Sequence, residues 1–510
     1  MAVSRWQVAL VIAMLLTSGP ESRAQLRSWS VVPSIGLRGT YTDNALFVAA
    51  PEHGDFVTSI SPGISINGQG PRLTANLAYT GNLLFYSNSS EQNRLANTLN
   101  GSANFKAIEN FLFLDANANI SQSYISPFGA RPSDITTAAA NRTETRSLSL
   151  SPYIRSTTPG GYSYEARYRN TLTTTDTSSL ADVYTETVSS NIASPIDRFG
   201  WSLDGNRTKI HYAYSDETRR PDSRSSIIRG RFYYQPDTAV RLWLTAGNES
   251  NNYVLQQEQS YSIYGYGALW KPTPTTTAQY SWERRFFGPA PFASFEHRTP
   301  LSAWTLTYSK DVSSYQQQLF AVPPGDTTAL LDTIFSARIT DPARRQQAVQ
   351  QFMQANGTPA FLANSLAFYT QQVFLRERLQ GSFAILGARN SITFTAFAAN
   401  DASVSTPPPG LPADVFAAFN SHIKQKGYGA NATHQISGLT ALTGSATRTN
   451  ADTEETSVRS KNDFYSLSLT HRISPKTDTF AGLSYQTFES DVVAATSRSR
   501  SVYAGLYHSF

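Results

Sequence analysis

The chain alternates apolar and polar side chains with a period of two over long stretches, and this pattern restricts the fold more than any other feature. From 73 to 86, Leu, Ala, Tyr, Gly and Phe fall on one face, and mainly Thr, Asn and Tyr fall on the other. Successive side chains of a β-strand point to opposite faces, so the pattern predicts strands with one apolar face. It recurs at 99–106, 110–121, 161–170 and 304–309. We therefore expect an all-β chain.

A soluble sandwich hides such an apolar face in a core, whereas a membrane barrel turns it toward lipid. Three features favour the barrel. The predicted strands have about 10 to 14 residues, the length that a tilted membrane strand needs. Aromatic residues such as Tyr41, Phe56 and Phe286 lie near strand ends, where interface girdles occur. The last strand ends on Phe510, after apolar residues at 502, 504 and 506. We predict a transmembrane antiparallel up-and-down β-barrel.

Short and long connections alternate along the chain, which predicts short periplasmic turns, long extracellular loops and both termini in the periplasm. The count gives 22 strands, within a range of 18 to 24. It treats 287–298 as a long loop, Ser309 to Ser313 as a short turn and 314–322 as a strand.

One predicted extracellular loop, 323–368, is long and partly helical. Asp341 and Pro342 are helix-start residues before Ala343 to Ala355, and Gly357 follows. Further helical turns are expected at 329–337 and 412–420. The loop either folds into the lumen as a constriction, covers the mouth, or stays a solvated surface loop.

Residues 1–24 have the pattern of a secretory signal peptide, with Arg5, a short apolar run and a small-residue cleavage site before Gln25. The barrel is then 25–510. Removing the peptide lowers the formal net charge from +5 to +4, which argues against a nucleic-acid partner. The chain has no cysteine, which excludes disulfides and thiolate metal sites. No later segment is apolar enough for a transmembrane helix. We expect an outer-membrane protein of a Gram-negative bacterium.

Catalytic and cofactor motifs are missing from the sequence. The seven histidines form no HExxH pair, and no GxSxG, P-loop or GxGxxG motif is present. We expect no enzymatic activity, cofactor or metal, although a barrel enzyme that acts on lipid or surface polysaccharide stays an alternative.

Charged side chains on the predicted polar face form a candidate lumen lining. It comprises Arg38, Arg72, Asp115, Glu165, Arg167, Arg169, Glu283 and Arg285. Such a wall favours anionic solutes or binds sugar hydroxyls, or else it is an ion-pair ladder that only braces the interior. Glu377 falls on the apolar face, so we expect it near a membrane interface or beside a bulge.

Several strings in the first half resemble a family of outer-membrane barrels associated with PEP-CTERM/exosortase exopolysaccharide systems. They are Tyr41-Thr42-Asp43-Asn44, Ser61-Pro62-Gly63, Leu112-Phe113-Leu114-Asp115, Ser151-Pro152-Tyr153, Glu165-Ala166-Arg167-Tyr168, Glu283-Arg284-Arg285-Phe286-Phe287-Gly288 and His297-Arg298-Thr299. The resemblance implies a protein made alongside polysaccharide synthesis and export machinery. It supplies no catalytic or binding residue.

We therefore expect a pore or an accessory component of exopolysaccharide export. The alternatives are a closed structural or adhesive barrel and the barrel enzyme. A TonB-dependent receptor is disfavoured because the alternation begins near residue 29 and leaves no room for a plug. Expected partners are outer-membrane lipid, the barrel-assembly machinery that recognises Phe510, and polysaccharide with its export proteins.

Overall fold

The computed structural model describes residues 28–177, 182–213, 222–253, 257–314, 327–336, 345, 349, 373–404, 422–454, 457–492 and 495–510. The predicted signal peptide 1–24 and the predicted helix 412–420 lie outside these residues. The predicted strand 314–322 lies outside them after Ser314. No helix in the described part is long and apolar enough to cross a membrane.

Twenty-two β-strands make up most of the described chain. Their bounds are β1 Ser28–Thr42, β2 Asp55–Gln69, β3 Leu73–Tyr86, β4 Arg94–Ile108, β5 Leu112–Tyr124, β6 Arg142–Thr157, β7 Ser163–Thr175, β8 Asp182–Ala193, β9 Phe199–Ala213, β10 Ser223–Tyr234, β11 Val240–Asn251, β12 Gln259–Thr273, β13 Thr276–Arg285, β14 Gly288–Arg298, β15 Ser302–Ser314, β16 Val373–Leu386, β17 Asn390–Ser403, β18 Ile423–Ser437, β19 Thr440–Thr453, β20 Arg459–Ser474, β21 Thr477–Ser490 and β22 Ala495–Ser509. A 3₁₀ turn, η1, spans Ser90–Gln92, and a helix, α3, spans Thr327–Phe335.

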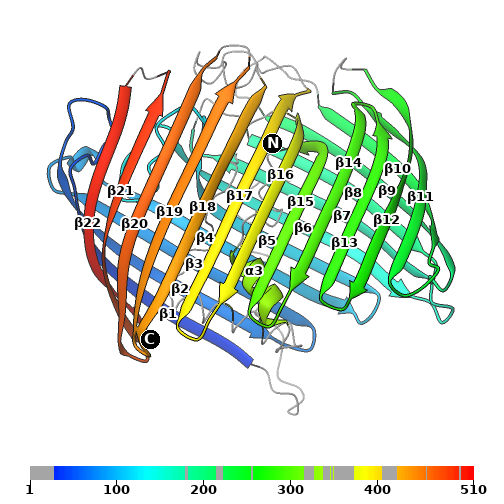
Figure 1. Ribbon diagram of the computed structural model, residues 1–510, viewed down its shortest axis with the longest axis horizontal. Helices are drawn as coiled ribbons and strands as arrows, with labels where there is room; N and C mark the ends of the chain where they lie inside the picture. The colour runs from blue at the N-terminus through cyan, green and yellow to red at the C-terminus, as the bar shows by residue number, and fades with distance from the viewer. Residues whose placement is uncertain are drawn as a thin grey trace.

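The sheet closes into a barrel (Figure 1). Each strand pairs antiparallel with the next, and β1 pairs with β22 from Ser34↔Ser509 to Thr42↔Ser501. Closure leaves no free sheet edge, which is what a β-structure needs in lipid. The predicted antiparallel all-β barrel of 22 strands is confirmed.

The two ends of the barrel differ. Turns of two to five residues join the strands at one end, which we call the turn end, and β1 begins and β22 finishes there (Figure 1). The other end carries the longer connections, including 43–54, 125–141, 315–372 and 404–422. We call it the loop end.

The strand count was predicted correctly through two errors that offset each other. Residues 287–298 are not a loop, because β14 occupies Gly288–Arg298 after a two-residue turn at Phe286 and Phe287. Ser309 to Ser313 is not a turn, because β15 runs through it to Ser314. Pro289 and Pro291 made β14 look like a loop. They are tolerated because β14 pairs with β15 only from Phe292 onward, so the ladder needs no N–H from either proline.

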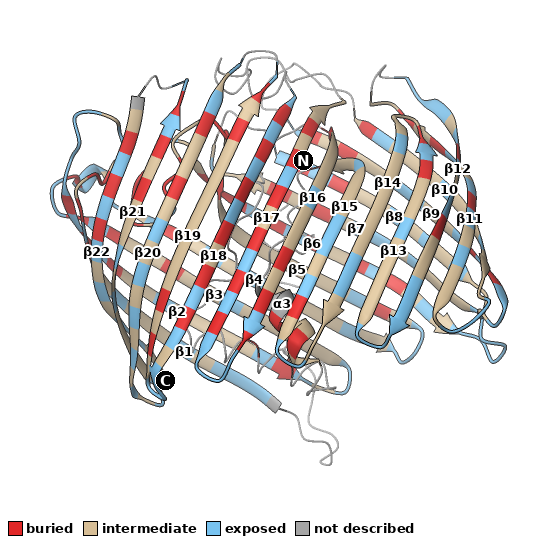
Figure 2. Ribbon diagram, in the orientation of Figure 1, coloured by how far each residue is buried: buried red, intermediate tan, exposed pale blue. Residues whose placement is uncertain are grey.

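The outer face is apolar and the inner face polar. Outward residues such as Leu244, Tyr264, Trp270, Leu483 and Val502 are 54 to 64% exposed, whereas many inward threonines and serines are buried. Figure 2 shows buried and exposed positions alternating along strands such as β17. A membrane barrel presents this apolar surface to lipid and keeps polar side chains in the lumen.

Candidate functional site: the barrel lumen

The first group of charges on the inner wall joins β5 and β7. Asp115 accepts hydrogen bonds from Asn104 Nδ2 at 2.5 Å and from Arg167 Nη1 at 2.6 Å. Arg167 Nε also donates to Glu165 at 3.0 Å, and the guanidinium lies 3.7 Å from the Tyr153 ring centroid. Three of the predicted lining residues thus form one hydrogen-bonded cluster on an aromatic support.

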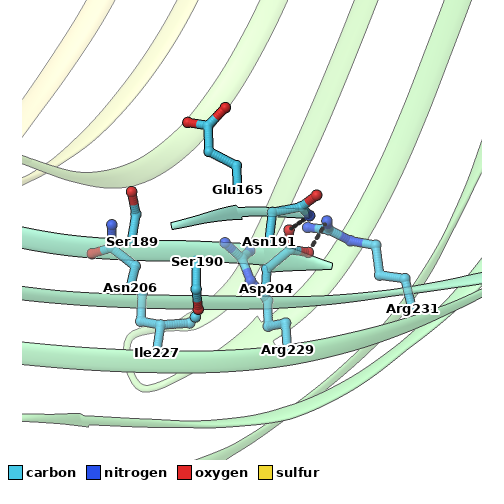
Figure 3. A pocket seen from close by; sticks show the side chains of 10 residues that line it. Glu165, Ser189, Ser190, Asn191, Asp204, Asn206, Ile227, Arg229 and Arg231 are labelled. Atoms are coloured by element: carbon cyan, nitrogen blue, oxygen red, sulfur yellow. Dashed lines mark hydrogen bonds and ion pairs between the residues drawn. The ribbon is translucent and has the colours of Figure 1, made fainter. Parts of the chain in front are cut away.

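A second group lies on β8 to β13 around a cavity of about 260 Å³ (Figure 3). Asp204 accepts from Asn191 Nδ2 at 2.6 Å and from Arg231 Nη1 at 2.7 Å. Arg229 Nη1 donates to Glu283 Oε2 at 2.9 Å. The cavity is lined by Glu165, Ser189, Ser190, Asn191, Asp204, Gly205, Asn206, Ile227, Arg229 and Arg231. Paired guanidinium and carboxylate groups with amides and hydroxyls offer many donors and acceptors to a polar solute.

Among the described residues, the most buried ion pair of the wall joins β11 and β13. Arg285 Nη2 lies 2.7 Å from Glu249 Oε2, and the two side chains are 5% and 2% exposed. The same guanidinium reaches Asp311 at 3.3 Å, and Glu249 also accepts the Phe286 N–H. This network braces the wall at the loop end, where β13 turns into β14.

The remaining predicted lining residues lie in different places. Arg169 faces inward and donates to Ser151 Oγ at 3.1 Å, and Arg38 faces inward from β1 and pairs with Asp134. Arg72 is exposed in the turn before β3, because the strand begins at Leu73 after Gly70 and Pro71. Arg72 is therefore not on the wall.

Sequence reasoning missed the inward pair on β16 and β17. Arg376 Nε and Nη2 donate to the Asp401 carboxylate at 2.5 and 2.8 Å, and Asp401 is fully buried. Arg378 lies two residues further along β16 on the same face. The alternation of this strand, with Leu379 and Phe383 on the lipid face, was the signal that could have identified both arginines.

Residues 125–141, which we call the inner segment, fold into the barrel at the loop end. Phe128 packs against Phe374, Ile423 and Ala451, which belong to β16, β18 and β19. The inner segment leaves the wall at β5, and β5 and β16 are half the 22-strand ring apart. The inner segment therefore crosses the lumen.

Polar contacts hold the inner segment to strand β21. Ser490 Oγ donates to the Phe128 carbonyl at 2.7 Å, and Gln486 Nε2 donates to the Arg131 carbonyl at 2.7 Å. The Ser133 N–H donates to Gln486 Oε1 at 2.8 Å. Burial lowers the pKa of Arg131 to about 10. Its guanidinium also lies 5.4 Å from the Phe488 ring.

Charged side chains of β1, β4 and β6 hold the other half of the inner segment. Arg94 donates to the Ile135 carbonyl at 2.8 Å, and Arg142 donates to the Pro132 carbonyl at 2.6 Å. Asp134 pairs with Arg38 and accepts the N–H and hydroxyl of Thr136, each at 2.9 Å. Burial works to raise the pKa of Asp134, but Arg38 and Thr136 favour the carboxylate more, so its pKa lies below the usual range.

Apolar side chains from distant strands also meet at the loop end. Val183 of β8 and Ile210 and Tyr212 of β9 form one buried cluster with Val373 of β16, and Ile125 packs against it. Six strands separate β9 from β16 along the ring. The described residues thus bridge the lumen at this end by apolar contacts as well as by the inner segment.

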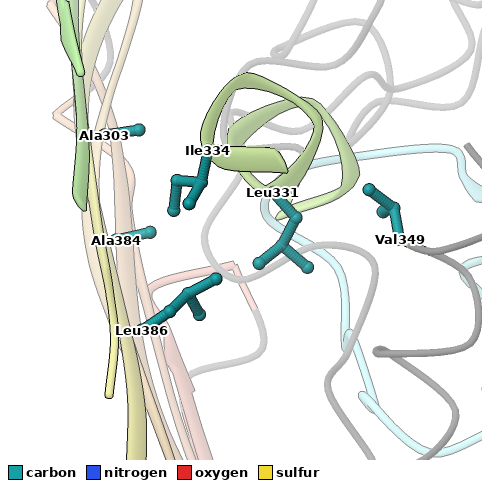
Figure 4. Close-up of a cluster of buried hydrophobic side chains, with 6 residues drawn as sticks. All are labelled: Ala303, Leu331, Ile334, Val349, Ala384 and Leu386. Atoms are coloured by element: carbon teal, nitrogen blue, oxygen red, sulfur yellow. The ribbon is translucent and has the colours of Figure 1, made fainter. Parts of the chain in front are cut away.

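Helix α3 belongs to the long connection between β15 and β16 but lies against the inner wall near the turn end. Leu331 and Ile334 are buried against Ala303, Ala384 and Leu386, with Val349 on the other side (Figure 4). Arg298 Nη1 donates to Ser336 Oγ at 2.7 Å. Helix α3 overlaps the expected 329–337 turns but begins two residues earlier, and Arg345 and Val349 of the expected Ala343–Ala355 helix are helical. Three placements were expected for loop 323–368, and its described residues have the one inside the lumen.

Glu377 lies on the outer face, near the loop end of β16. Its carboxylate accepts the Tyr308 hydroxyl at 2.6 Å and lies 3.8 Å from Lys310 Nζ. Both partners are outward residues of β15. Outward charge is tolerated near an interface, where the cost of exposing it to lipid is small. Within the described part of the chain, no group of His, Asp and Glu residues has a metal-binding arrangement.

No family model matches the chain, and neither does any curated protein sequence. Among solved structures, the siderophore receptor PirA from Acinetobacter baumannii is 8% identical, with 96% of this chain and 81% of that chain covered and a TM-score of 0.48. PirA from Pseudomonas aeruginosa is 10% identical, with 96% and 82% covered and a TM-score of 0.44. An anion-selective porin from Comamonas acidovorans is 8% identical, with 95% and 100% covered and a TM-score of 0.33. The barrel assignment rests on the strand pairing of this chain alone.

Proposed function

We propose that this protein is an outer-membrane conduit that serves exopolysaccharide export, with a polar lumen that the inner segment and helix α3 narrow at rest. The observation that carries the proposal is a wall of paired arginines and carboxylates in a lumen that two folded-in segments enter. The strings that resemble exopolysaccharide-associated barrels support the choice of cargo. On this proposal the turn end and both termini face the periplasm, and the barrel-assembly machinery recognises Phe510.

The wall chemistry suits a hydrated polymer. Guanidinium and carboxylate groups that are already paired offer planar donor and acceptor edges to sugar hydroxyls without a large net field. Inward aromatic rings such as Tyr153, Tyr233 and Trp243 add flat surfaces; the rings of Tyr233 and Trp243 lie 6.3 Å apart. A polymer passes such a wall through many weak contacts, each of which breaks easily.

The second candidate is a closed structural or adhesive barrel. The bridging contacts of Phe128 and of the Tyr212 cluster favour it, because they join strands that lie far apart around the ring. The two candidates differ in whether the inner segment ever leaves the lumen.

Single-channel recording of refolded residues 25–510 in a planar bilayer separates them. The export proposal predicts discrete openings that a soluble exopolysaccharide blocks transiently from the side facing the turn end. A barrel that inserts with intact β-structure but never conducts, under any voltage, contradicts the proposal and supports the structural alternative.

A further inference from the structure

Four inward side chains on β16, β17 and β18 carry buried polar atoms without a hydrogen-bond partner. These atoms are Nε and Nη2 of Arg378, Oγ of Ser382, Oγ1 of Thr393 and Nδ2 of Asn431. We call these four residues the donor site. Buried polar groups in folded proteins are nearly always paired, so a cluster of unpaired ones calls for an explanation.

The four side chains lie on one face of three adjacent strands. Thr393 lies directly opposite Asn431 in the β17–β18 ladder and directly opposite Ala384 in the β16–β17 ladder. Ser382 is two residues from Ala384 on β16, so its side chain stands about 7 Å away on the same face. Arg378 lies four residues beyond Ser382 on that face, about 14 Å further along β16. The donor site is therefore a patch three strands wide.

This patch faces the lumen. Leu379, Ile392, Phe394 and Tyr428, which have the opposite parity on these strands, are 41 to 50% exposed on the outer face. The alternation of buried and exposed residues along β17 and β18 is visible in Figure 2. Between Arg378 and Thr393, the inward ring of Phe397 is buried and lies 5.9 Å from the guanidinium. Gly427 gives the ring room, since a Cβ there would come within 2.8 Å of it.

The chemistry of the donor site selects its ligand. Arg378 and Asn431 contribute only donors at the unpaired atoms, and the two hydroxyls can donate or accept. The nearest inward carboxylate, Asp401, is engaged by both Nε and Nη2 of Arg376. Among the described residues, Arg378 thus has a positive charge, a free planar fork and no carboxylate of its own. A carboxylate matches such a fork with two parallel hydrogen bonds.

We propose that the donor site binds a stretch of an acidic polymer in the lumen through the carboxylate of a uronic acid unit. The Arg378 fork holds the carboxylate of one unit, and Ser382, Thr393 and Asn431 bind the hydroxyls of neighbouring units further along the face. This assignment rests on the proposed export function and names the class of polymer that is carried.

Titration calorimetry on the refolded chain 25–510 in detergent tests the assignment, with trigalacturonate as the acidic probe and maltotriose as the neutral one. The intact chain and the variant with 126–140 shortened, described below, are both titrated so that access is covered. We expect trigalacturonate to bind more tightly than maltotriose. R378Q should weaken its binding by about ten- to hundredfold. R378K, which keeps the charge but loses the fork, should recover only part of the affinity.

Arg72 supplies the control, because its side chain is exposed in the turn before β3 and does not lie on the wall. R72Q should leave the affinity unchanged, and circular dichroism should show all variants folded. Equal binding of the acidic and neutral probes, or equal losses in R378Q and R72Q, overturns the donor site. Absence of trigalacturonate binding in both backgrounds also overturns it. Polymer block of the channel is a separate measurement, so the export function stands or fails independently.

Discussion

The ion pair between Arg38 and Asp134 anchors the inner segment to β1, and its removal tests whether that segment closes the lumen. The side chains are only 24% and 16% exposed. Breaking a buried pair from one side costs about 3–5 kcal/mol. Asparagine in D134N keeps a group that can accept the Thr136 hydrogen bonds, and both residues retain some contact with solvent. We therefore expect D134N to weaken docking by about 2 kcal/mol, or about 25-fold in the released population.

The assay is the open probability of the refolded channel at fixed voltage. D134N should raise it by about that factor until it saturates. The matched control is D176N, because Asp176 pairs with Arg146 but both side chains are at least half exposed. Exposed pairs contribute about 0–1 kcal/mol, so D176N should change the open probability less than about fivefold. Equal open probabilities in D134N, D176N and the wild type would refute the anchoring role.

The lowered pKa of Asp134 gives the same anchor a pH dependence. When the segment is released, the carboxyl titrates near its ordinary value of about 3.9. Because the docked pKa lies lower, the stabilisation is fully present above the released value and is lost as pH falls through the docked value. Wild-type channels should therefore open more as the pH falls below about 4, and D134N should lack this acid-induced increase.

Three further substitutions test the other contacts. F128A removes the ring that reaches β16, β18 and β19, so docking of the inner segment should weaken by about 3–5 kcal/mol. The open probability should rise while the barrel keeps its β-structure, and unchanged currents would contradict an inner segment that crosses the lumen. L331D puts a charge into the apolar contact of helix α3, so limited proteolysis should cleave within 327–336 faster than in the wild type; equal cleavage would contradict its lumenal docking. R285Q leaves Glu249 buried without its cation and should destabilise the barrel by about 3–5 kcal/mol in urea unfolding, whereas R500Q, at a side chain that is 74% exposed, should cost less than about 1 kcal/mol; similar midpoints would contradict the bracing role.

The barrel was predictable because lipid outside and water inside impose a period of two on every strand. Long segments such as β3 and β5 show this period plainly, and so the barrel fold could be predicted from them. The errors fell between 287 and 313, where Pro289 and Pro291 interrupt the pattern in a strand that pairs fully on one side only. The prolines look like turn residues in the sequence. The strand pairing of Gly288 to Pro291 comes from β13, because β14 pairs with β15 only from Phe292 onward.

The residues that line the lumen were predictable where the alternation along a strand determines which side chains face inward. The alternation alone puts Asp115, Arg167 and Glu283 on the inner face. It fails for Arg72 because β3 begins one residue later, at Leu73. The inner segment has no alternation of apolar and polar residues from which its position could be predicted. Its position depends on contacts such as Phe128 with Ser490 and Arg131 with Ser460, which join residues more than 320 positions apart in the chain. Pairings at that separation are selected by the closed barrel and leave no local pattern.

Shortening the inner segment tests the central claim most directly. The Ile125 N–H donates to the Asn141 carbonyl at 3.0 Å, so an Asn-Gly turn can replace 126–140 without disturbing β5 or β6. The loop 87–93, replaced in the same way, is the control. We expect a stepwise gain in single-channel conductance for the first variant and wild-type currents for the second. Equal conductance in both variants, with both barrels folded, would contradict a lumen closed by this segment.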